Sequence, residues 1–209
     1  MAGAFKASAE VLLAAEKDSV SHRELPTCFL LRHATELFLK SALVVAHRAF
    51  VSTGADFPAV SVGGKSKAMT HVHGVGALYA ALVAVLNEHQ AELEKRARTA
   101  WLPMPEELNK AIRDIEAMDE RGVFFRYPTE RNEAKSVNKP MTAQELTGWD
   151  SDQRGALKAL VMLNNDDEIV GAYRYDPNLL TEELATLQSA CDWLNSIHVG
   201  LRIELAGGR

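Results

Sequence analysis

The fold is decided by Leu31-Arg32-His33-Ala34-Thr35-Glu36-Leu37-Phe38-Leu39-Lys40, the centre of a mostly apolar stretch from Leu25 to Phe50. Its periodicity predicts one long helix with apolar residues on most of its sides and a single row of charge. Such a helix is buried, and buried charges are stable only when they are paired. The row therefore needs partners in the chain, in a second subunit or in a ligand, and its predicted members are Arg32, His33, Glu36, Lys40 and His47.

Composition limits the class of protein to which the chain belongs. The 209 residues are 47% hydrophobic and 24% charged, a normal balance for a globular protein with a sizeable core. The net charge of −5 argues against a broad nucleic-acid surface, which normally carries a basic excess, although a local basic cleft is compatible with it.

Cysteine usage and hydropathy bear on the compartment. Cys28 and Cys191 lie far apart in apolar helical contexts and in no metal spacing, so we expect buried free thiols in a reducing cytoplasm. The apolar runs are too short to span a bilayer, and residues 1–16 lack the order of a signal peptide. We expect a soluble, cytoplasmic protein without a membrane partner.

The remaining segments predict an all-α fold with a small β addition. Besides the helix over 25–50, apolar spacing predicts helices at 3–17, about 71–98, 106–120 and 182–204. We therefore expect one domain over residues 1–209, an up-and-down bundle of about five helices with a β-hairpin or irregular insertion at about 123–176.

Within the insertion, Val123–Pro128 is extended and residues 129–155 are polar and irregular. Residues 157–163 and 168–175 predict a β-hairpin across a polar four-residue turn, with a short helix over 154–163 as the competing interpretation. Earlier in the chain, Gly63-Gly64-Lys65-Ser66 has the letters of a phosphate loop, but the buried strand before it and the second spaced glycine are missing. We interpret residues 60–67 as a loop or a short strand and turn.

Three segments together resemble a known family. They are Arg32–Leu43, His73-Gly74-Val75-Gly76-Ala77-Leu78, and Asp119–Pro128 with its Phe-Arg-Tyr-Pro end. Over roughly residues 5–130 they resemble bacterial proteins of the HEPN superfamily, the helical domain named for higher eukaryote and prokaryote nucleotide binding. Many members carry Arg-His-x-x-Glu-Leu-x-Leu-Lys, a His-Asp-Leu-x-x-Leu helix start and an Asp…Gly…Phe-Arg-Tyr-Pro strand. The second segment differs from the family pattern, because Gly74 occupies the position where the family usually has a capping Asp.

The resemblance implies an up-and-down helical bundle that is often a dimer. Members include toxins paired with nucleotidyltransferase antitoxins, defence proteins, and metal-independent ribonucleases that share an Arg-x(4–6)-His motif. That motif is absent here: His33 directly follows Arg32, Arg126 and Arg131 have no histidine within reach, and His198 has no arginine at the required distance upstream. Ribonuclease activity is therefore not carried over residue by residue.

The charged row has three interpretations. The spacing of Arg32, Glu36 and Lys40 forms intrahelical pairs, which favours a buried ion network that positions the Phe-Arg-Tyr-Pro segment. Arg and Lys on an apolar wall also suit a phosphate-binding cleft. In the third interpretation His33 and Glu36 act as an acid and base pair in catalysis.

Other polar residues are candidate partners of the row. His71-x-His73 lacks the further ligands of a metal site, so we expect His73 to start a helix or contact the row, and we expect no metal and no cofactor. Arg126 is expected to pair with Glu36 or Asp119. Tyr127 is expected to pack beside Phe125 on an extended segment.

These observations give one functional interpretation and two alternatives. The first is a HEPN-like homodimer that binds a nucleotide, an RNA or a protein partner such as an antitoxin, in a defence or toxin–antitoxin setting. We lean away from an enzyme. The alternatives are a metal-independent endoribonuclease with a variant active site and a structural dimerisation module. The variant site would be built from Arg32, His33, Glu36 and Arg126.

Overall fold

The computed structural model describes residues 1–15, 23–51, 57–119, 138–150, 157, 159–175 and 180–208. The chain divides into two compact units. One comprises Met1–Arg126 together with Glu182–Arg209, and the other comprises Tyr127–Thr181. The first is built of long helices, whereas the second contains a three-stranded sheet and is inserted into the first along the sequence.

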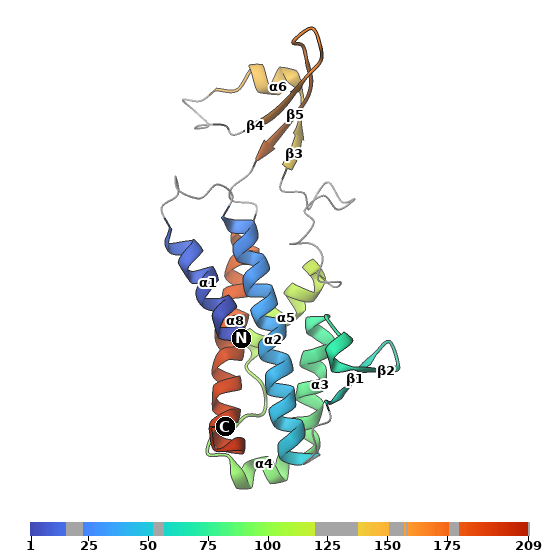
Figure 1. The fold of residues 1–209 in the computed structure, drawn as a ribbon, viewed down its shortest axis with the longest axis vertical. Coiled ribbons are helices and arrows are strands. Elements are labelled where there is room, and N and C mark those ends of the chain that lie inside the picture. Colours follow the sequence, from blue (N-terminus) through green and yellow to red (C-terminus); the bar gives the residue numbers. More distant parts are fainter. Residues whose placement is uncertain are drawn as a thin grey trace. The chain divides into compact units, whose positions relative to one another are not determined.

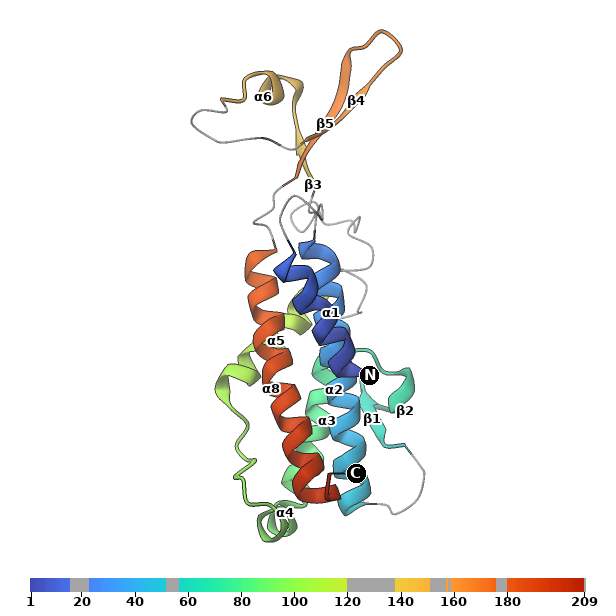
Figure 2. The same ribbon diagram turned by 60° about the vertical axis from the view of Figure 1, so that its left-hand side comes forward.

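The long helix predicted around Arg32 is the centre of the helical unit. This helix, α2, runs from Glu24 to Phe50, and both α1 and α3 pack against it. Helix α8 runs along α2 on another side, as both views of the ribbon show (Figures 1 and 2). The bounds of the other helices are α1 Ala2–Ala14, α3 Val75–Glu88, α4 Gln90–Arg96, α5 Glu106–Asp119 and α8 Thr181–Ala206.

The core follows the predicted apolar stripes. On α3, Leu78, Leu82 and Leu86 recur every four residues and are fully buried. Full burial of one such side chain contributes about 1.5–3 kcal/mol relative to its exposure. Cys28 and Cys191 are buried free thiols, as predicted, and burial raises the pKa of the Cys28 thiol to about 12.

The third helix differs from its prediction. Instead of one helix over about 71–98, the chain forms a 3₁₀ turn at Met69–His71, α3 from Val75, and the separate short helix α4. The start is delayed because His73 contacts α2 through both its carbonyl and its ring. The break falls at His89, whose ring stacks on Phe50 of α2 with centroids 5.2 Å apart. Tertiary contacts have overridden the local helical preference at both points.

Residues 59–68 form a small antiparallel hairpin. Strand β1 (Ala59–Val62) pairs with β2 (Lys65–Ala68), and the turn is Gly63-Gly64 with φ of 57° and 75°. Positive φ at both central residues is what a two-residue hairpin turn of type I′ requires, and glycine adopts it without strain. The Gly-Gly-Lys-Ser sequence is thus a hairpin turn between two strands, with no helix following the glycines directly.

The inserted unit contains the predicted hairpin and more. Strands β4 (Ala159–Leu163) and β5 (Ile169–Tyr175) pair antiparallel, so the hairpin is confirmed and the competing helix over 154–163 is wrong at 159–163. The expectation of irregular structure over 129–155 is wrong for β3 (Asn138–Met141) and α6 (Ala143–Thr147). A capping box between Thr142 and Glu145 starts α6, and β3 pairs with β5. The predicted extended segment Val123–Pro128 lies outside the described residues.

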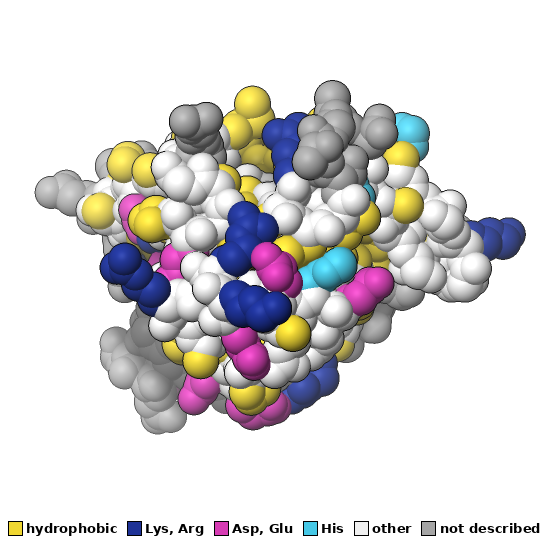
Figure 3. Space-filling view, turned by 90° about the horizontal axis from the view of Figure 1, so that it is seen from below, with side chains coloured by type: hydrophobic (Ala, Val, Ile, Leu, Met, Phe, Trp, Pro, Cys, Tyr) yellow, Lys and Arg dark blue, Asp and Glu magenta, His cyan; other side chains and the backbone are white. Residues whose placement is uncertain are grey.

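The chain is thus mostly helical with small antiparallel sheets. Its described part contains seven α-helices, where the sequence predicted about five, and a third strand beside the hairpin. No helix in this part is long and apolar enough to cross a bilayer. The end of the helical unit where α4 lies shows acidic, basic and apolar side chains side by side (Figure 3), so this face carries no field of one sign.

A close contact ties α8 to the segment that follows α4. A Cβ at Gly200 would lie 2.3 Å from the Trp101 ring, so the ring occupies the space above the glycine. The indole Nε1–H of Trp101 donates to Glu204, one turn later, at 2.8 Å. Glycine in a helix normally costs stability relative to alanine, and here the cost is offset by the packing of the indole.

We expect Gly200→Ala to lower the free energy of unfolding by about 1–3 kcal/mol, because the new methyl group displaces Trp101 from Glu204. Gly3→Ala in α1, where a Cβ meets nothing within 4 Å, is the control and should leave stability unchanged or raise it. Urea unfolding followed by tryptophan fluorescence measures both variants. Equal stabilisation by the two changes would contradict the packing role of Gly200.

Candidate functional site

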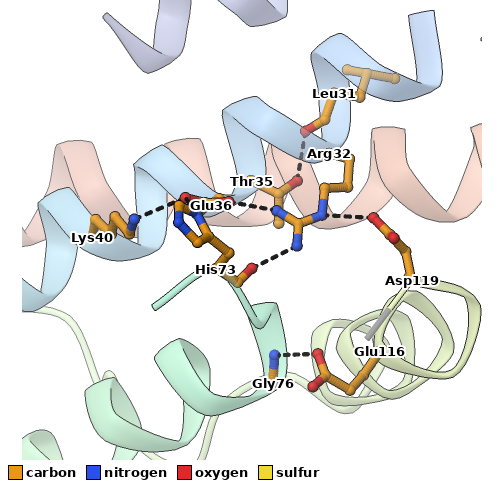
Figure 4. Close-up of polar contacts among 9 residues, drawn as sticks. All are labelled: Leu31, Arg32, Thr35, Glu36, Lys40, His73, Gly76, Glu116 and Asp119. Carbon is orange, nitrogen blue, oxygen red and sulfur yellow. Dashed lines mark hydrogen bonds and ion pairs between the residues drawn. The ribbon is translucent and has the colours of Figure 1, made fainter. Parts of the chain in front are cut away.

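The Arg32 guanidinium of α2 joins three segments of the helical unit (Figure 4). Its Nε–H donates to Oδ2 of Asp119 at the end of α5 (3.0 Å), and Nη1 donates to Oε2 of Glu36 (2.7 Å). Its Nη2 donates to the backbone carbonyl of His73, just before α3 (2.6 Å). One side chain therefore fixes the position of α2 relative to both α5 and the start of α3.

Glu36 is the second junction of the cluster. Its Oε1 accepts a hydrogen bond from Nζ of Lys40 at 2.8 Å and lies 3.0 Å from Nδ1 of His73. Its Oε2 is occupied by Arg32. The spacing of Arg32, Glu36 and Lys40 along α2 thus produces the intrahelical pairs expected for residues four apart.

The cluster is buried and balanced in charge. Arg32, Glu36 and Asp119 are 4%, 2% and 3% exposed, and with Lys40 they form two positive and two negative groups. Charges this deep in a protein are tolerated because each has an opposite charge and hydrogen bonds at short range. Removing one member is costly, because it leaves the opposite charge buried without compensation.

The pKa of Glu36 reflects this setting. Burial on its own would raise the pKa of the carboxyl group, because it disfavours the charged form. The hydrogen bond and charge of Lys40, then the charge of Arg32 and the contact with His73, outweigh burial and hold the pKa below its ordinary value. Glu36 is therefore ionised at neutral pH and serves as an acceptor rather than as a proton donor.

Two members of the cluster form its edge. The side chain of His73 is 57% exposed and that of Lys40 is 15% exposed. Because Nδ1 of His73 faces Glu36, the opposite side of the imidazole, which carries Nε2, is directed away from the carboxylate. Lys40 has three N–H donors, and Glu36 accepts one of them. Because Nδ1 must carry a proton to donate to the Glu36 carboxylate, Nε2 is a second donor only when the imidazole is protonated. In that form His73 and Lys40 together present the donors that phosphate oxygens require.

His33 does not join this arrangement as the sequence predicted. Its ring lies against Phe5 of α1 (centroids 4.5 Å apart, edge to face) and is stacked with Phe29 (6.1 Å). One residue along a helix is a rotation of about 100°, enough to turn His33 toward α1 while Arg32 faces α5. The histidine at the Glu36 carboxylate is His73, from another segment.

Two further candidates cannot be placed. Arg126 and Tyr127 lie outside the described residues, so their predicted contacts with Glu36, Asp119 and Phe125 stay predictions. Asp119, which was considered as a partner of Arg126, contacts Arg32.

Sequence reasoning missed Glu116. Gly74 provides no side-chain cap at the start of α3, and Oε2 of Glu116 on α5 instead accepts the N–H of Gly76 at 2.8 Å. A carboxylate from another helix thus caps this helix start in place of a local side chain. A Cβ at Gly76 would lie 2.9 Å from the Glu116 carboxyl carbon, so glycine at 76 permits this approach. No local spacing signals a cap that comes from 40 residues away.

The last helix contributes a half-buried histidine. His198 lies with Nε2 at 2.9 Å from Oγ of Ser41 on α2, and its ring is 5.7 Å from that of Phe38. Burial lowers the pKa of His198, followed by the charge of Arg202, so the neutral form is favoured. His198 belongs to the contact between α2 and α8 rather than to the Arg32 cluster.

The described residues contain no group of three His, Cys, Asp or Glu side chains placed to hold a metal ion. Comparisons of the chain with protein-family models, with curated proteins and with solved structures gave no match.

Arg32→Met should lower the free energy of unfolding by about 3–5 kcal/mol, because the carboxylates of Glu36 and Asp119 stay buried without their shared guanidinium. Lys40→Met should cost only about 1–2 kcal/mol, since Glu36 keeps Arg32 and His73. Chemical denaturation measures both variants. Equal losses would show that Arg32 is no more central than its neighbour.

Acid should weaken the fold through Glu36. Because the folded-state pKa of this group is depressed, its stabilising contribution is complete above the ordinary value of 4.5 and is lost as the pH falls through the lower, folded-state pKa. Glu36→Gln should therefore show a shallower fall of unfolding free energy below pH 4.5 than the wild type. Glu107→Gln, the same change at an exposed position of α5, is the control. Denaturant titrations at a series of pH values test this, and identical slopes for both variants would contradict it.

Proposed function

We propose that the chain is a HEPN-like protein that binds a phosphate-bearing ligand, a nucleotide or an RNA, at the His73–Lys40 edge. The observation that supports this is the combination of a buried, self-compensated cluster with an exposed rim. Arg32, Glu36 and Asp119 hold the rim in place, and His73 presents an imidazole that is 57% exposed. In its protonated form His73 makes a preorganised donor pair with Lys40, and such a pair loses little conformational entropy when a phosphate binds.

The contacts that Arg32 and His33 make within the protein favour ligand binding over RNA cleavage as the function of the cluster. Three N–H groups of Arg32 donate to protein acceptors, so this guanidinium is engaged in the fold rather than directed at a substrate. His33 packs between two phenylalanine rings. The variant ribonuclease site built from Arg32, His33, Glu36 and Arg126 thus receives no support from its described members.

One observation favours a catalytic alternative. The contact of His73 with Glu36, at 3.0 Å, resembles a general base oriented by a carboxylate, which would accept a proton at Nε2. In an endoribonuclease that proton would come from a 2′-hydroxyl. This second candidate uses His73 in place of the predicted His33.

The biological setting of the proposal comes from the resemblance alone. Proteins of the HEPN superfamily are often dimers and include defence proteins and toxins paired with antitoxins, so the proposal includes a homodimer and a protein partner such as an antitoxin. A structural dimerisation module is the competing proposal, in which the cluster has no ligand.

Nucleotide and RNA binding test the proposal directly. Isothermal titration of the full chain with ATP, GTP, cyclic nucleotides and a short single-stranded RNA should show binding of at least one ligand. His73→Ala should weaken it by about tenfold, a loss of about 1.4 kcal/mol, because the exposed donor is removed. His71→Ala, an exposed histidine two residues earlier, is the matched control and should bind like the wild type.

If the wild type bound none of these nucleotides and no RNA, the proposal would be overturned and the structural module favoured. Equal weakening by both histidine variants would place the ligand elsewhere. A parallel incubation with total RNA and tRNA separates binding from catalysis: cleavage that His73→Ala abolishes and His33→Ala retains would establish the catalytic alternative. Cleavage lost in both variants would instead point to a general dependence on the fold.

A further inference from the structure

The inserted unit exposes an apolar strand at the edge of its sheet. The strand order is β3-β5-β4, so β4 has a neighbour on one side only among the described residues (Figure 1). Its sequence, Ala159-Leu160-Val161-Met162-Leu163, is wholly apolar. Leu160, Met162 and Leu163 are 63%, 44% and 53% exposed, and Val170 on β5 is also exposed. Side chains on both faces of the strand are thus in contact with water.

The two edges of the same sheet are built differently. Strand β3 contains Pro140, which lacks an N–H and so cannot donate to a further strand, and its sequence also includes Lys139. Proline and lysine are the devices with which proteins protect sheet edges from unwanted pairing. Strand β4 has neither. Its bare backbone edge and apolar side chains are those of a strand that receives another strand.

The charges that flank β4 in the sequence favour a second copy of the same strand as its partner. The residues just before β4 in the sequence include Arg154 and Lys158, whereas those just after it include Asp166, Asp167 and Glu168. When two identical strands pair antiparallel, the beginning of each lies beside the end of the other. Such pairing brings a basic end beside an acidic end twice, whereas parallel pairing would bring like charges together.

We propose that β4 pairs antiparallel with β4 of a second copy of this chain, joining two three-stranded sheets into one of six strands. With the two-fold axis at Val161, Leu160 of one copy faces Met162 of the other, and Ala159 faces Leu163. Every side chain of the strand then has an apolar partner, and the outer N–H and C=O groups of the two edges satisfy each other.

This inference deepens the homodimer part of the proposed function and rests on it, but it involves only the sheet unit. Ligand binding at His73 is read by titration, and β4 pairing is read by molecular mass. Failure of one is therefore distinguishable from failure of the other.

Analytical ultracentrifugation of the full chain tests the pairing. The wild type should sediment as a concentration-dependent dimer, and Val161→Lys should raise its dissociation constant by at least about tenfold, because two ammonium groups would face each other at the axis. Val170→Lys places the same charge on the central strand β5 and should leave the dimer intact. A wild type that is monomeric at every concentration, or a dimer that survives Val161→Lys, would overturn the proposal.

Cross-linking gives a second readout that does not depend on how Val161→Lys folds. Residues directly opposite in an antiparallel pair have Cα atoms about 4.5–5.5 Å apart, within reach of a disulfide. Val161→Cys should therefore form a covalent dimer under mild oxidation, while Val170→Cys should not. The native Cys28 and Cys191 are buried and stay in place. Absence of a Val161→Cys dimer, or equal cross-linking at both positions, would overturn β4 pairing.

Discussion

The helical unit depends on a guanidinium that is almost fully buried. Apolar packing drives the helices together but is not directional, so it leaves their relative rotation and register weakly defined. Arg32 defines the rotation and register of the helices, because the N–H groups of its planar guanidinium donate hydrogen bonds only in fixed directions. Those partners lie 4, 41 and 87 residues away along the chain, on α2, before α3 and at the end of α5. The contacts of Arg32 thus fix the relative positions of three elements that are far apart in the sequence.

The same cluster combines two properties that usually exclude each other. Its interior is closed, since Arg32, Glu36 and Asp119 are almost fully buried. Its rim is open, since His73 lies largely in water. A buried charge network that ends at the surface offers a rigid base for a polar contact, and this is the physical reason for proposing a ligand there.

Local spacing made the long elements and the intrahelical pairs predictable. The stripe of α5 and the sequence from Glu24 to Phe50 follow the 3.6-residue period, and Arg32, Glu36 and Lys40 pair as residues four apart should. The two segments on either side of the polar turn Asn164–Asp167 predicted the hairpin, which is confirmed. The ring contacts of His33 with Phe5 and Phe29 were not predictable in this way, because they depend on how α1 packs against α2.

Contacts between distant segments were beyond the reach of sequence reasoning. The approach of Glu116 to Gly76 depends on how α5 crosses α3, and the break at His89 depends on Phe50. The short helix α6 is different, because its Thr-x-x-Glu capping box at Thr142–Glu145 is a local sequence signal for a helix start within a polar stretch.

The insertion of the sheet unit bears on how the chain is made. Because α8 follows Tyr127–Thr181 in the sequence, the ribosome must finish that whole segment before α8 emerges. At a synthesis rate of about 5–20 residues per second, several seconds pass between the synthesis of α5 and that of α8. Meanwhile the side of α2 that receives His198, including Ser41 and Phe38, has no α8 to cover it. The nascent chain therefore passes through a stage in which this side of α2 lacks its α8 partner, and α8 covers it only after the sheet unit has been synthesised.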